Sequence, residues 1–287
     1  MIDNTTKEAI KQQLIKFCEN YTSDNKASTA LGISNAYVSQ IKNGKWDAIS
    51  DDMWRKLSKL VGFSMEDGVI HADTRTYVAI KQCFDNSKLY SNVMAAIARS
   101  GSGKTYALDR YRQLSQNVFY YKCKRSTTPK EFLTELLRSM GKNATMGSIA
   151  ALLRQLENMC ERLELPIIII DEIEKTKNDI LYLTIDLYNT IHRKAGIVYL
   201  GTPYFKERIE RGVERGRMCF PEILSRLGGK FIEVPSANSK DAAMVVRAHG
   251  ISSELEVTEI VNDSSDNFRN ADLRRVDRLI HSKKIAA

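Results

Sequence analysis

The chain has 287 residues, a net charge of +8 and 43% hydrophobic residues. This composition is typical of a soluble globular protein with one large domain or two smaller ones, and it excludes fibrous and disordered classes. The longest purely apolar run, Ile167 to Ile170, is far too short to span a bilayer, so we expect no membrane partner. The polar start MIDNTTKEAIKQQL predicts no signal peptide, and five scattered cysteines favour free thiols in a bacterial or phage-infected cytoplasm.

The positive charge lies in the middle of the chain. Residues 1–68 and residues 235–287 each carry as many basic as acidic side chains, whereas residues 69–234 carry 26 basic against 18 acidic ones. A concentrated basic field attracts polyanions, of which nucleic acid is the commonest. The pattern favours nucleic-acid binding by the middle region over a merely solvated surface.

The first 66 residues predict a small all-α domain. Apolar residues at helical spacing predict helices over 5–20 and 51–61, and two short helices lie between them, over 26–31 and 35–43. Gly32 suits the left-handed end of the first short helix, and Ser34 or Asn35 can cap the second. This is helix-turn-helix spacing, and SQIKNGK at the end of the second short helix resembles the recognition helix of the lambda-repressor class.

The second short helix offers polar side chains to a DNA groove, where amide groups can read adenine edges. The candidates are Asn35, Tyr37, Ser39, Gln40 and Lys42. Because residues 1–68 carry no net charge, their attraction to phosphate would be weak. Docking to a protein therefore stays open beside contact with DNA.

Residues 67–75 predict a polar linker, and residues 76–235 then alternate strands with helices. We expect strands over 92–98, 118–121, 167–170, 197–200 and 231–234, with helices over 78–84, 104–114, 129–140, 146–163, 180–194 and 204–211. Such alternation predicts an α/β fold with a parallel sheet between two layers of helices. Residues 236–287 predict a helical C-terminal lid, with helices near 239–249, 253–262 and 268–282.

The stretch VMAAIARSGSGKTYALDRY has the setting of a phosphate-binding P-loop, since it follows an apolar strand and opens a helix. Ala98 stands where the pattern has its first glycine, but this position precedes the curl of the loop and tolerates a methyl group if its φ is negative. Lys104 would reach the β- and γ-phosphates of ATP, and Thr105 would ligate Mg²⁺. The predicted nucleotide-binding residues are Ser100, Gly101, Ser102, Gly103, Lys104, Thr105 and Tyr106.

The stretch LPIIIIDEIEK places two carboxylates at the end of a buried strand, roughly seventy residues after the P-loop. Asp171 would hold the Mg²⁺ through water. Glu172 would orient the attacking water as general base. Together the two stretches predict a Mg²⁺-dependent ATPase.

Three further stretches, over roughly residues 75–282, resemble an AAA+ ATPase of the transposition target-selection group, which contains MuB, TnsC, TniB and IstB. GIVYLGTPYF resembles the sensor-1 strand, with Thr202 between the acidic pair and the γ-phosphate. FPEILSRLGG resembles the segment that carries an arginine finger, here Arg226. FRNADLRRVDRLI resembles the sensor-2 helix, in which Arg274 matches better than its neighbour Arg275.

The resemblance implies a homo-oligomer, because an arginine finger acts on the nucleotide of a neighbouring subunit. A head-to-tail contact that does not close gives a helical filament, and MuB-like proteins form such filaments on DNA with ATP. The implied partners are double-stranded DNA, further copies of the chain and a DDE-type transposase. Two alternatives remain: a helicase-loader ATPase of the DnaC and IstB kind, and a DNA-binding regulator that uses ATP as an assembly switch.

The densest basic patch is YYKCKRSTTPKEF, which follows the second expected strand. The residues predicted to contact DNA there are Lys122, Lys124, Arg125 and Lys130, with Ser126, Thr127 and Thr128 as further phosphate donors. In the related families this side of the ATPase faces the inner channel. A second basic stretch, YFKERIERGVERGRMCF, is interleaved with acids, so a role between subunits or on a helix surface is equally open there.

Overall fold

The computed structural model describes residues 4–19, 21–46, 49–61, 72–141, 147–266 and 270–286. The described chain divides into two compact units. One unit holds residues 75–107 and 117–236, and the other holds residues 1–74, 108–116 and 237–287. Most of the expected linker, residues 67–71, lies outside the described residues.

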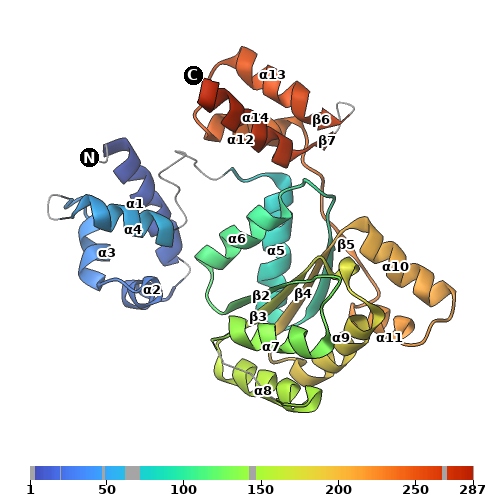
Figure 1. Ribbon diagram of the computed structural model, residues 1–287. Helices are drawn as coiled ribbons and strands as arrows, with labels where there is room; N and C mark the ends of the chain where they lie inside the picture. Colours follow the sequence, from blue (N-terminus) through green and yellow to red (C-terminus); the bar gives the residue numbers. More distant parts are fainter. Residues whose placement is uncertain are drawn as a thin grey trace. The chain divides into compact units, whose positions relative to one another are not determined.

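A parallel sheet of five strands forms the centre of the first unit, as far as that unit is described (Figure 1). Its strands lie in the order β2 (Val118–Lys122), β3 (Ile167–Asp171), β4 (Gly196–Gly201), β1 (Val93–Ile97) and β5 (Ile232–Glu233). Every neighbouring pair is parallel, so all five strands end at the same edge of the sheet. The predicted α/β fold with a parallel sheet is confirmed.

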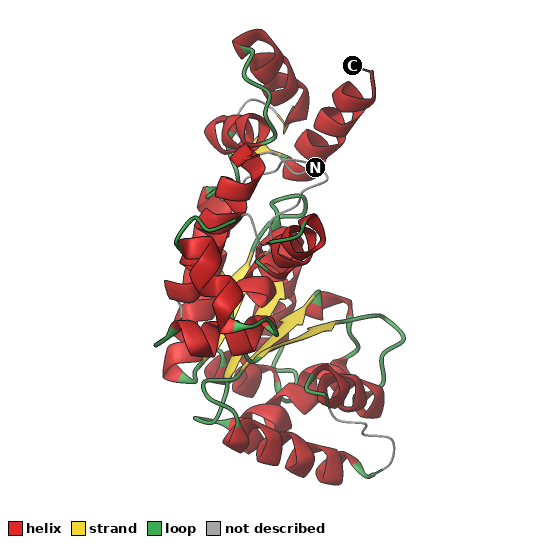
Figure 2. Cartoon of the chain, turned by 90° about the vertical axis from the view of Figure 1, so that its left-hand side faces the viewer, coloured by secondary structure: helices red, strands yellow, loops and turns green. Residues whose placement is uncertain are grey.

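Helices lie on both sides of the strands, as Figure 2 shows. They are α5 (Arg75–Tyr90), α6 (Lys104–Leu114), α7 (Pro129–Ser139), α8 (Ile149–Arg162), α9 (Asn178–Ile191), α10 (Pro203–Glu214) and α11 (Phe220–Arg226), with a short 3₁₀ turn, η1 (Ile173–Lys175), after β3. The seven-residue helix α11 and the three-residue turn η1 were not expected from the sequence.

The run of four isoleucines in β3 has no alternation because both faces of this strand are covered. Ile168 and Ile170 belong to a core cluster that includes buried side chains of α7, α8 and α9. Ile167 and Ile169 are also completely buried. Each buried isoleucine stabilises the fold by about 1.5–3 kcal/mol relative to an exposed one. This central strand therefore fixes the position of the carboxylate that ends it.

Residues 4–60 contribute four helices with a core of their own: α1 (Asn4–Glu19), α2 (Asp24–Leu31), α3 (Asn35–Lys42) and α4 (Asp51–Leu60). The turn between α2 and α3 has the expected chemistry. Gly32 is left-handed at φ 62°, and the Ser34 hydroxyl accepts a hydrogen bond from the backbone N–H of Ala36. Val38 and Ile41 of α3 pack into the core with Trp54. The arrangement agrees with the helix-turn-helix interpretation, which remains an interpretation.

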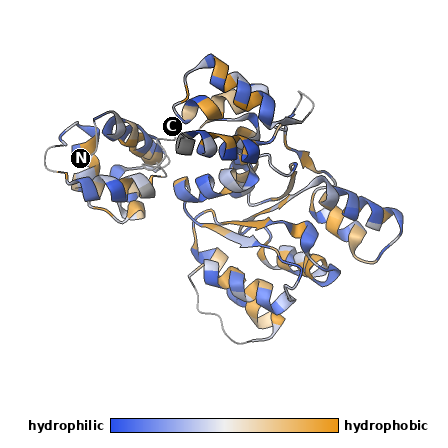
Figure 3. Ribbon diagram, turned by 45° about the horizontal axis from the view of Figure 1, so that its top comes forward, coloured by the Kyte–Doolittle hydropathy of each residue, from blue (hydrophilic) through white to orange (hydrophobic). Residues whose placement is uncertain are grey.

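The C-terminal residues form α12 (Ser239–Ala248), α13 (Glu254–Ser264) and α14 (Leu273–Ala286) around a small apolar core. In Figure 3, hydrophobic and hydrophilic residues alternate along these helices, which is typical of helices with one buried face. The expected helix from residue 268 is wrong at its start. Residues 270–271 form the strand β7, which pairs antiparallel with β6 (Ser265–Asp266). The side chain of Asp272 then caps α14 by accepting from the backbone N–H groups of Arg274 and Arg275.

None of the helices in the described part of the chain has the length and apolar character needed to cross a membrane.

Gly196 in β4 lies where α5 approaches the sheet too closely for a side chain. A Cβ added at Gly196 would lie 2.4 Å from the carbonyl oxygen of Ser87 in α5. That oxygen accepts from the N–H of Asn92, and the Ser87 hydroxyl donates to the Asn92 carbonyl at 2.8 Å. The backbone there cannot give way without breaking the connection into β1. We expect Gly196→Ala to lower the free energy of unfolding by about 2 kcal/mol in urea denaturation.

The matched control is Asn189→Ala, because Asn189 is exposed on α9 and the substitution removes no buried contact. We expect this control to stay within about 0.5 kcal/mol of the wild type. Equal stability of the two variants would contradict the close approach of α5 to β4.

Candidate nucleotide and nucleic-acid site

The P-loop runs from the end of β1 to the start of α6 and curls at two left-handed glycines. Gly101 has φ 76° and Gly103 has φ 91°, a backbone conformation that favours glycine. Ala98 is buried at the end of the strand, outside the left-handed region, and its N–H donates to the carbonyl of Gly201 at 3.0 Å. The alanine therefore leaves the curl of the loop intact, as expected.

Lys104 lies inside this curl. Its Nζ donates to the carbonyl oxygens of Ala98 and Arg99, both at 2.8 Å. The Ser102 hydroxyl donates to the same Arg99 carbonyl at 2.7 Å. Thr105 and Tyr106 follow in the first turn of α6 and are exposed, and Ser100 is exposed at the start of the loop. The loop thus presents a cation, hydroxyl groups and the N-terminus of an 11-residue helix together, which suits a phosphate group.

Asp171 ends β3 and is only 2% exposed. Its Oδ1 accepts from the backbone N–H of Glu172 at 2.8 Å, and its Oδ2 accepts from the Tyr120 hydroxyl at 3.4 Å. Burial raises the pKa of Asp171, while the hydrogen bond from the Glu172 backbone counteracts this effect. A buried carboxylate at the edge of the sheet from which the P-loop also leaves is suited to hold a divalent cation.

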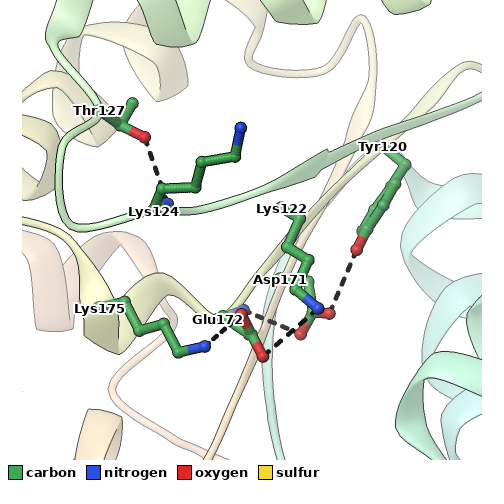
Figure 4. A network of polar contacts seen from close by, with 7 residues as sticks. All are labelled: Tyr120, Lys122, Lys124, Thr127, Asp171, Glu172 and Lys175. Carbon is green, nitrogen blue, oxygen red and sulfur yellow. Dashed lines mark hydrogen bonds and ion pairs between the residues drawn. The ribbon is translucent and has the colours of Figure 1, made fainter.

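Two lysines contact the carboxylate of Glu172: Lys122, which ends β2, and Lys175, which ends η1 (Figure 4). Lys175 donates to its Oε2 at 2.6 Å, and Lys122 lies 3.6 Å from its Oε1. Burial alone would raise the pKa of Glu172, but the hydrogen bond from Lys175 and the charge of Lys122 outweigh it and leave this pKa below its ordinary value. A carboxylate that stays ionised is the form required of a general base.

The backbone of Glu172 is left-handed, with φ 55° and ψ 34°. Residues other than glycine seldom adopt this conformation, and those that do are found mostly at turns and functional sites. The turn bends the chain out of β3 into η1. This bend brings Lys175 back to Glu172.

Thr202 leaves the sheet between the P-loop and the acidic pair, because β4 lies between β1 and β3. In the register of the sheet, Asp171 pairs with Leu200, and Ile97 pairs with Gly201. Thr202 occupies the N-cap position of α10, but its side chain makes no capping hydrogen bond. Its predicted place next to the nucleotide site agrees with this position.

Arg226 ends α11 and lies against its own chain. Its guanidinium carbon lies 4.8 Å from the centre of the Tyr188 ring, and its Nη2 lies 3.2 Å from the carboxylate of Glu222. The side chain is about one third exposed, at 37%. Its role as an arginine finger stays a prediction.

Arg274 and Arg275 are exposed in the first turn of α14. They belong to the second compact unit, whereas the P-loop belongs to the first. The preference for Arg274 as the sensor-2 residue also stays a prediction.

We refer to residues 122–130 as the basic loop. Its four predicted DNA contacts, Lys122, Lys124, Arg125 and Lys130, are exposed. In Figure 4 the Lys124 ammonium points away from Glu172, whereas that of Lys122 points toward it.

The hydroxyl groups of Thr127 and Thr128 form hydrogen bonds within the basic loop and at the start of α7. Thr127 is buried; its Oγ1 shares a hydrogen bond with the Tyr121 hydroxyl and accepts from the N–H of Lys124. Thr128 caps α7 by accepting from the N–H of Glu131. Burial of Thr127 contradicts the expectation that its hydroxyl contacts phosphate, whereas the contact expected from the exposed Thr128 stays a prediction.

The five candidates on α3 differ in availability. Asn35 and Ser39 are exposed, whereas Tyr37 and Gln40 are half-buried. Lys42 forms an ion pair with Asp24 of α2 at 2.9 Å, and this hydrogen bond raises the pKa of Lys42. Lys42 thus joins α2 to α3 in this structure.

Two members of the site were missed in the sequence. Tyr120 reaches Asp171 because β2 pairs with β3. The alternation of side chains along β2 was the signal that could have placed Tyr120 on the same face as Asp171. Lys175 reaches Glu172 across the unexpected η1 turn, and its spacing of three residues was a weak signal.

The residues present fit a magnesium nucleotide. A phosphate group suits the curl around Lys104, and oxygen ligands for Mg²⁺ are available from Thr105 and Asp171. Bound Mg²⁺ would neutralise charge on the phosphates during hydrolysis.

The geometry agrees with comparisons to known proteins. Residues 88–209 match the family model described as AAA domain. No curated protein sequence matches the chain. The Cdc6p crystal structure from Pyrobaculum aerophilum is similar with a TM-score of 0.56 and 14% identity, over 80% of this chain. At that identity the likeness shows the fold alone: the chain has an AAA+ P-loop fold.

Two further structures are similar with TM-scores below 0.5. They are the Drosophila ORC bound to DNA, with a TM-score of 0.48, 17% identity and 74% of this chain covered, and the replication initiator DnaA bound to AMPPCP and single-stranded DNA, with a TM-score of 0.47, 13% identity and 79% covered. The chain spans 66% of the Cdc6p chain, 55% of the ORC chain and 64% of the DnaA chain, less than two thirds of each.

The position of Lys104 leads to a prediction about nucleotide binding. We expect Lys104→Ala to weaken the binding of a fluorescent ATP analogue with Mg²⁺ by about 100-fold, since a charge-assisted contact to phosphate is lost. The control is Arg112→Ala, which removes a cation two turns further along α6. Fluorescence anisotropy measures both variants. Undiminished binding by Lys104→Ala would contradict this site.

Proposed function

We propose that this protein is an ATP-dependent, largely non-sequence-specific DNA-binding ATPase that assembles on duplex DNA and delivers target DNA to a DDE-type transposase in the cytoplasm. The observation that carries the proposal is the ion pair between Lys122 and Glu172. It joins the basic loop to the carboxylate that would activate water. Contact of Lys122 with DNA would thus directly affect the carboxylate that takes part in ATP hydrolysis.

The chain's own residues would divide the work of hydrolysis. Lys104 and the backbone N–H groups of the P-loop hold the phosphates, while Thr105 and Asp171 hold the metal ion. Glu172 would orient water and accept its proton, and Thr202 would help to hold that water in place. When Lys122 turns toward a DNA phosphate, Glu172 loses one of its two cationic partners.

If Arg226 is an arginine finger, the protein must assemble with further copies of itself. Arg226 would leave its place on Tyr188 and reach the nucleotide of a neighbouring copy. Each copy would then complete the site of the next, and Arg274 would add a further contact from the lid. A repeated head-to-tail contact of this kind builds a filament when it does not close into a ring.

A replication ATPase that loads a helicase is the second candidate, and the similarity in fold to Cdc6p favours it. Such a protein would use the same nucleotide site and the same chemistry. The two candidates differ in the protein that they contact.

Glu172→Gln tests the hydrolytic role. The amide keeps the size of the side chain but cannot accept the proton of water, so we expect ATP turnover to fall by about 100-fold or more while ATP binding is retained. With ATP, the variant should remain on duplex DNA as long assemblies, which electron microscopy and sedimentation can measure. Assemblies that disperse as quickly as those of the wild type would contradict disassembly by hydrolysis.

The control for this experiment is Glu161→Gln. Glu161 is half-exposed on α8 and forms a surface ion pair with Lys194, which contributes little to stability. Its turnover and assembly should match the wild type.

Affinity purification of the full chain, with ATP and DNA present, distinguishes the two candidates. We expect a DDE-type transposase to be recovered and its strand-transfer activity to rise in a reconstituted assay. The Lys104→Ala protein should recover none, since it cannot assemble with ATP. Recovery of a replicative helicase instead would favour the second candidate.

A further inference from the structure

A cleft of about 560 Å³ opens at the edge of the sheet where the strands end. Three segments line it, and they follow β2, β3 and β4. Arg125 comes from the basic loop, residues 174–177 come from η1 and the turn after it, and Tyr204 and Arg208 come from α10. Because these three strands are neighbours in the sheet, the segments that leave them meet.

The cleft is strongly cationic. Arg125, Lys175, Lys177 and Arg208 line it, against one acid, Glu174, among the described residues. One carboxylate oxygen of Glu174 is buried in the protein. A concave surface lined by one sign of charge focuses the field and attracts the opposite charge.

Arg208 holds one wall of the cleft in position. Its guanidinium donates to the carbonyl oxygens of Glu174 and Thr176, at 3.1 and 2.7 Å, and to the side chain of Asn178 at 2.8 Å. Burial lowers the pKa of Arg208, but an arginine keeps its charge at neutral pH. These bonds fix the segment between η1 and α9.

The fixed segment places its side chains alternately inside and outside the protein. Thr176 is buried, and its hydroxyl donates to the carbonyl of Ile173. Lys175 and Lys177, on either side of it, are exposed. Lys175 is engaged with Glu172, which leaves Lys177 as the lysine of this wall that lies outside the nucleotide site.

Tyr204 lies in the first turn of α10 and is 57% exposed. An exposed tyrosine beside cations is a frequent contact to nucleic-acid backbones, where its hydroxyl donates to phosphate oxygen. The cleft thus combines the exposed ammonium of Lys177, two guanidinium groups and a hydroxyl donor.

We propose that this cleft binds the phosphodiester backbone of duplex DNA and extends the interface of the basic loop toward α10. The inference rests on the DNA-binding function proposed above. Arg125 belongs to both surfaces, so the backbone continues from one to the other. Lys177 and Arg125 contact phosphate, Tyr204 donates its hydroxyl, and Arg208 positions the wall.

The test measures affinity for a duplex of random sequence at several salt concentrations, with ATP and the full chain. The slope of log K against log salt concentration is negative, and loss of one phosphate contact makes it shallower by about 0.9. We expect this change for Lys177→Ala. Tyr204→Phe removes a neutral donor and keeps the ring. We expect it to weaken binding by roughly 2- to 10-fold at an unchanged salt slope.

Two control variants carry the same chemistry at the opposite edge of the sheet. Arg162 ends α8 just before β3, and Tyr90 ends α5 just before β1; both are exposed. Arg162→Ala and Tyr90→Phe should leave affinity and salt slope unchanged. Thermal unfolding of all four variants confirms that each is folded.

A fifth variant, Lys124→Ala, separates the cleft from the basic loop. If it weakens duplex binding while Lys177→Ala and Tyr204→Phe do not, the cleft proposal is wrong and the proposed function stands. If the wild type itself does not bind duplex DNA with ATP, the proposed function fails. Loss of self-association by Lys177→Ala without DNA would make the cleft a protein interface and overturn the inference, as would an effect confined to a single-stranded oligonucleotide.

Discussion

Backbone hydrogen bonds between β2 and β3 set Lys122 opposite Asp171, and those between β3 and β4 set Asp171 opposite Leu200. The parallel pairing therefore brings Lys122 of the basic loop and the buried carboxylate of Asp171 to the same edge of the sheet. The P-loop leaves this edge from β1, one strand beyond β4. A shift of β3 by one residue would turn Asp171 to the other face and separate all three groups.

Burial and charge act in opposite directions on the two carboxylates at this edge. Asp171 lies deep enough for burial to raise its pKa, whereas Glu172 lies in the reach of Lys122 and Lys175, which lower its pKa. Adjacent carboxylates thus acquire different protonation behaviour because their surroundings differ. Both lysines are exposed, so a ligand that attracts either ammonium group would change the surroundings of the Glu172 carboxylate.

Much of this site could be predicted from the sequence because its signals are local. The isoleucines stand directly before Asp171, and the glycines of the P-loop stand directly before Lys104. Each stretch can therefore be recognised by itself in the sequence. The partners of Glu172 and Lys42 are different: Lys122 and Asp24 reach them through tertiary contacts that no spacing along the chain reveals. Thr127 was misjudged for the same reason, since its hydroxyl is occupied by Tyr121 across a turn. The strand β7 was missed because two residues carry too little periodicity to be recognised.

The left-handed backbone at Glu172 has a consequence for how this protein would respond to selection for stability. An amino acid with a Cβ in that conformation costs roughly 1–2 kcal/mol, and glycine avoids most of this cost. Replacement of Glu172 by glycine would relieve strain in the backbone at the very position whose carboxylate faces the nucleotide site. A library screened only for resistance to heat would therefore favour glycine at this position, and the chains so enriched would lose the carboxylate that Lys122 and Lys175 contact.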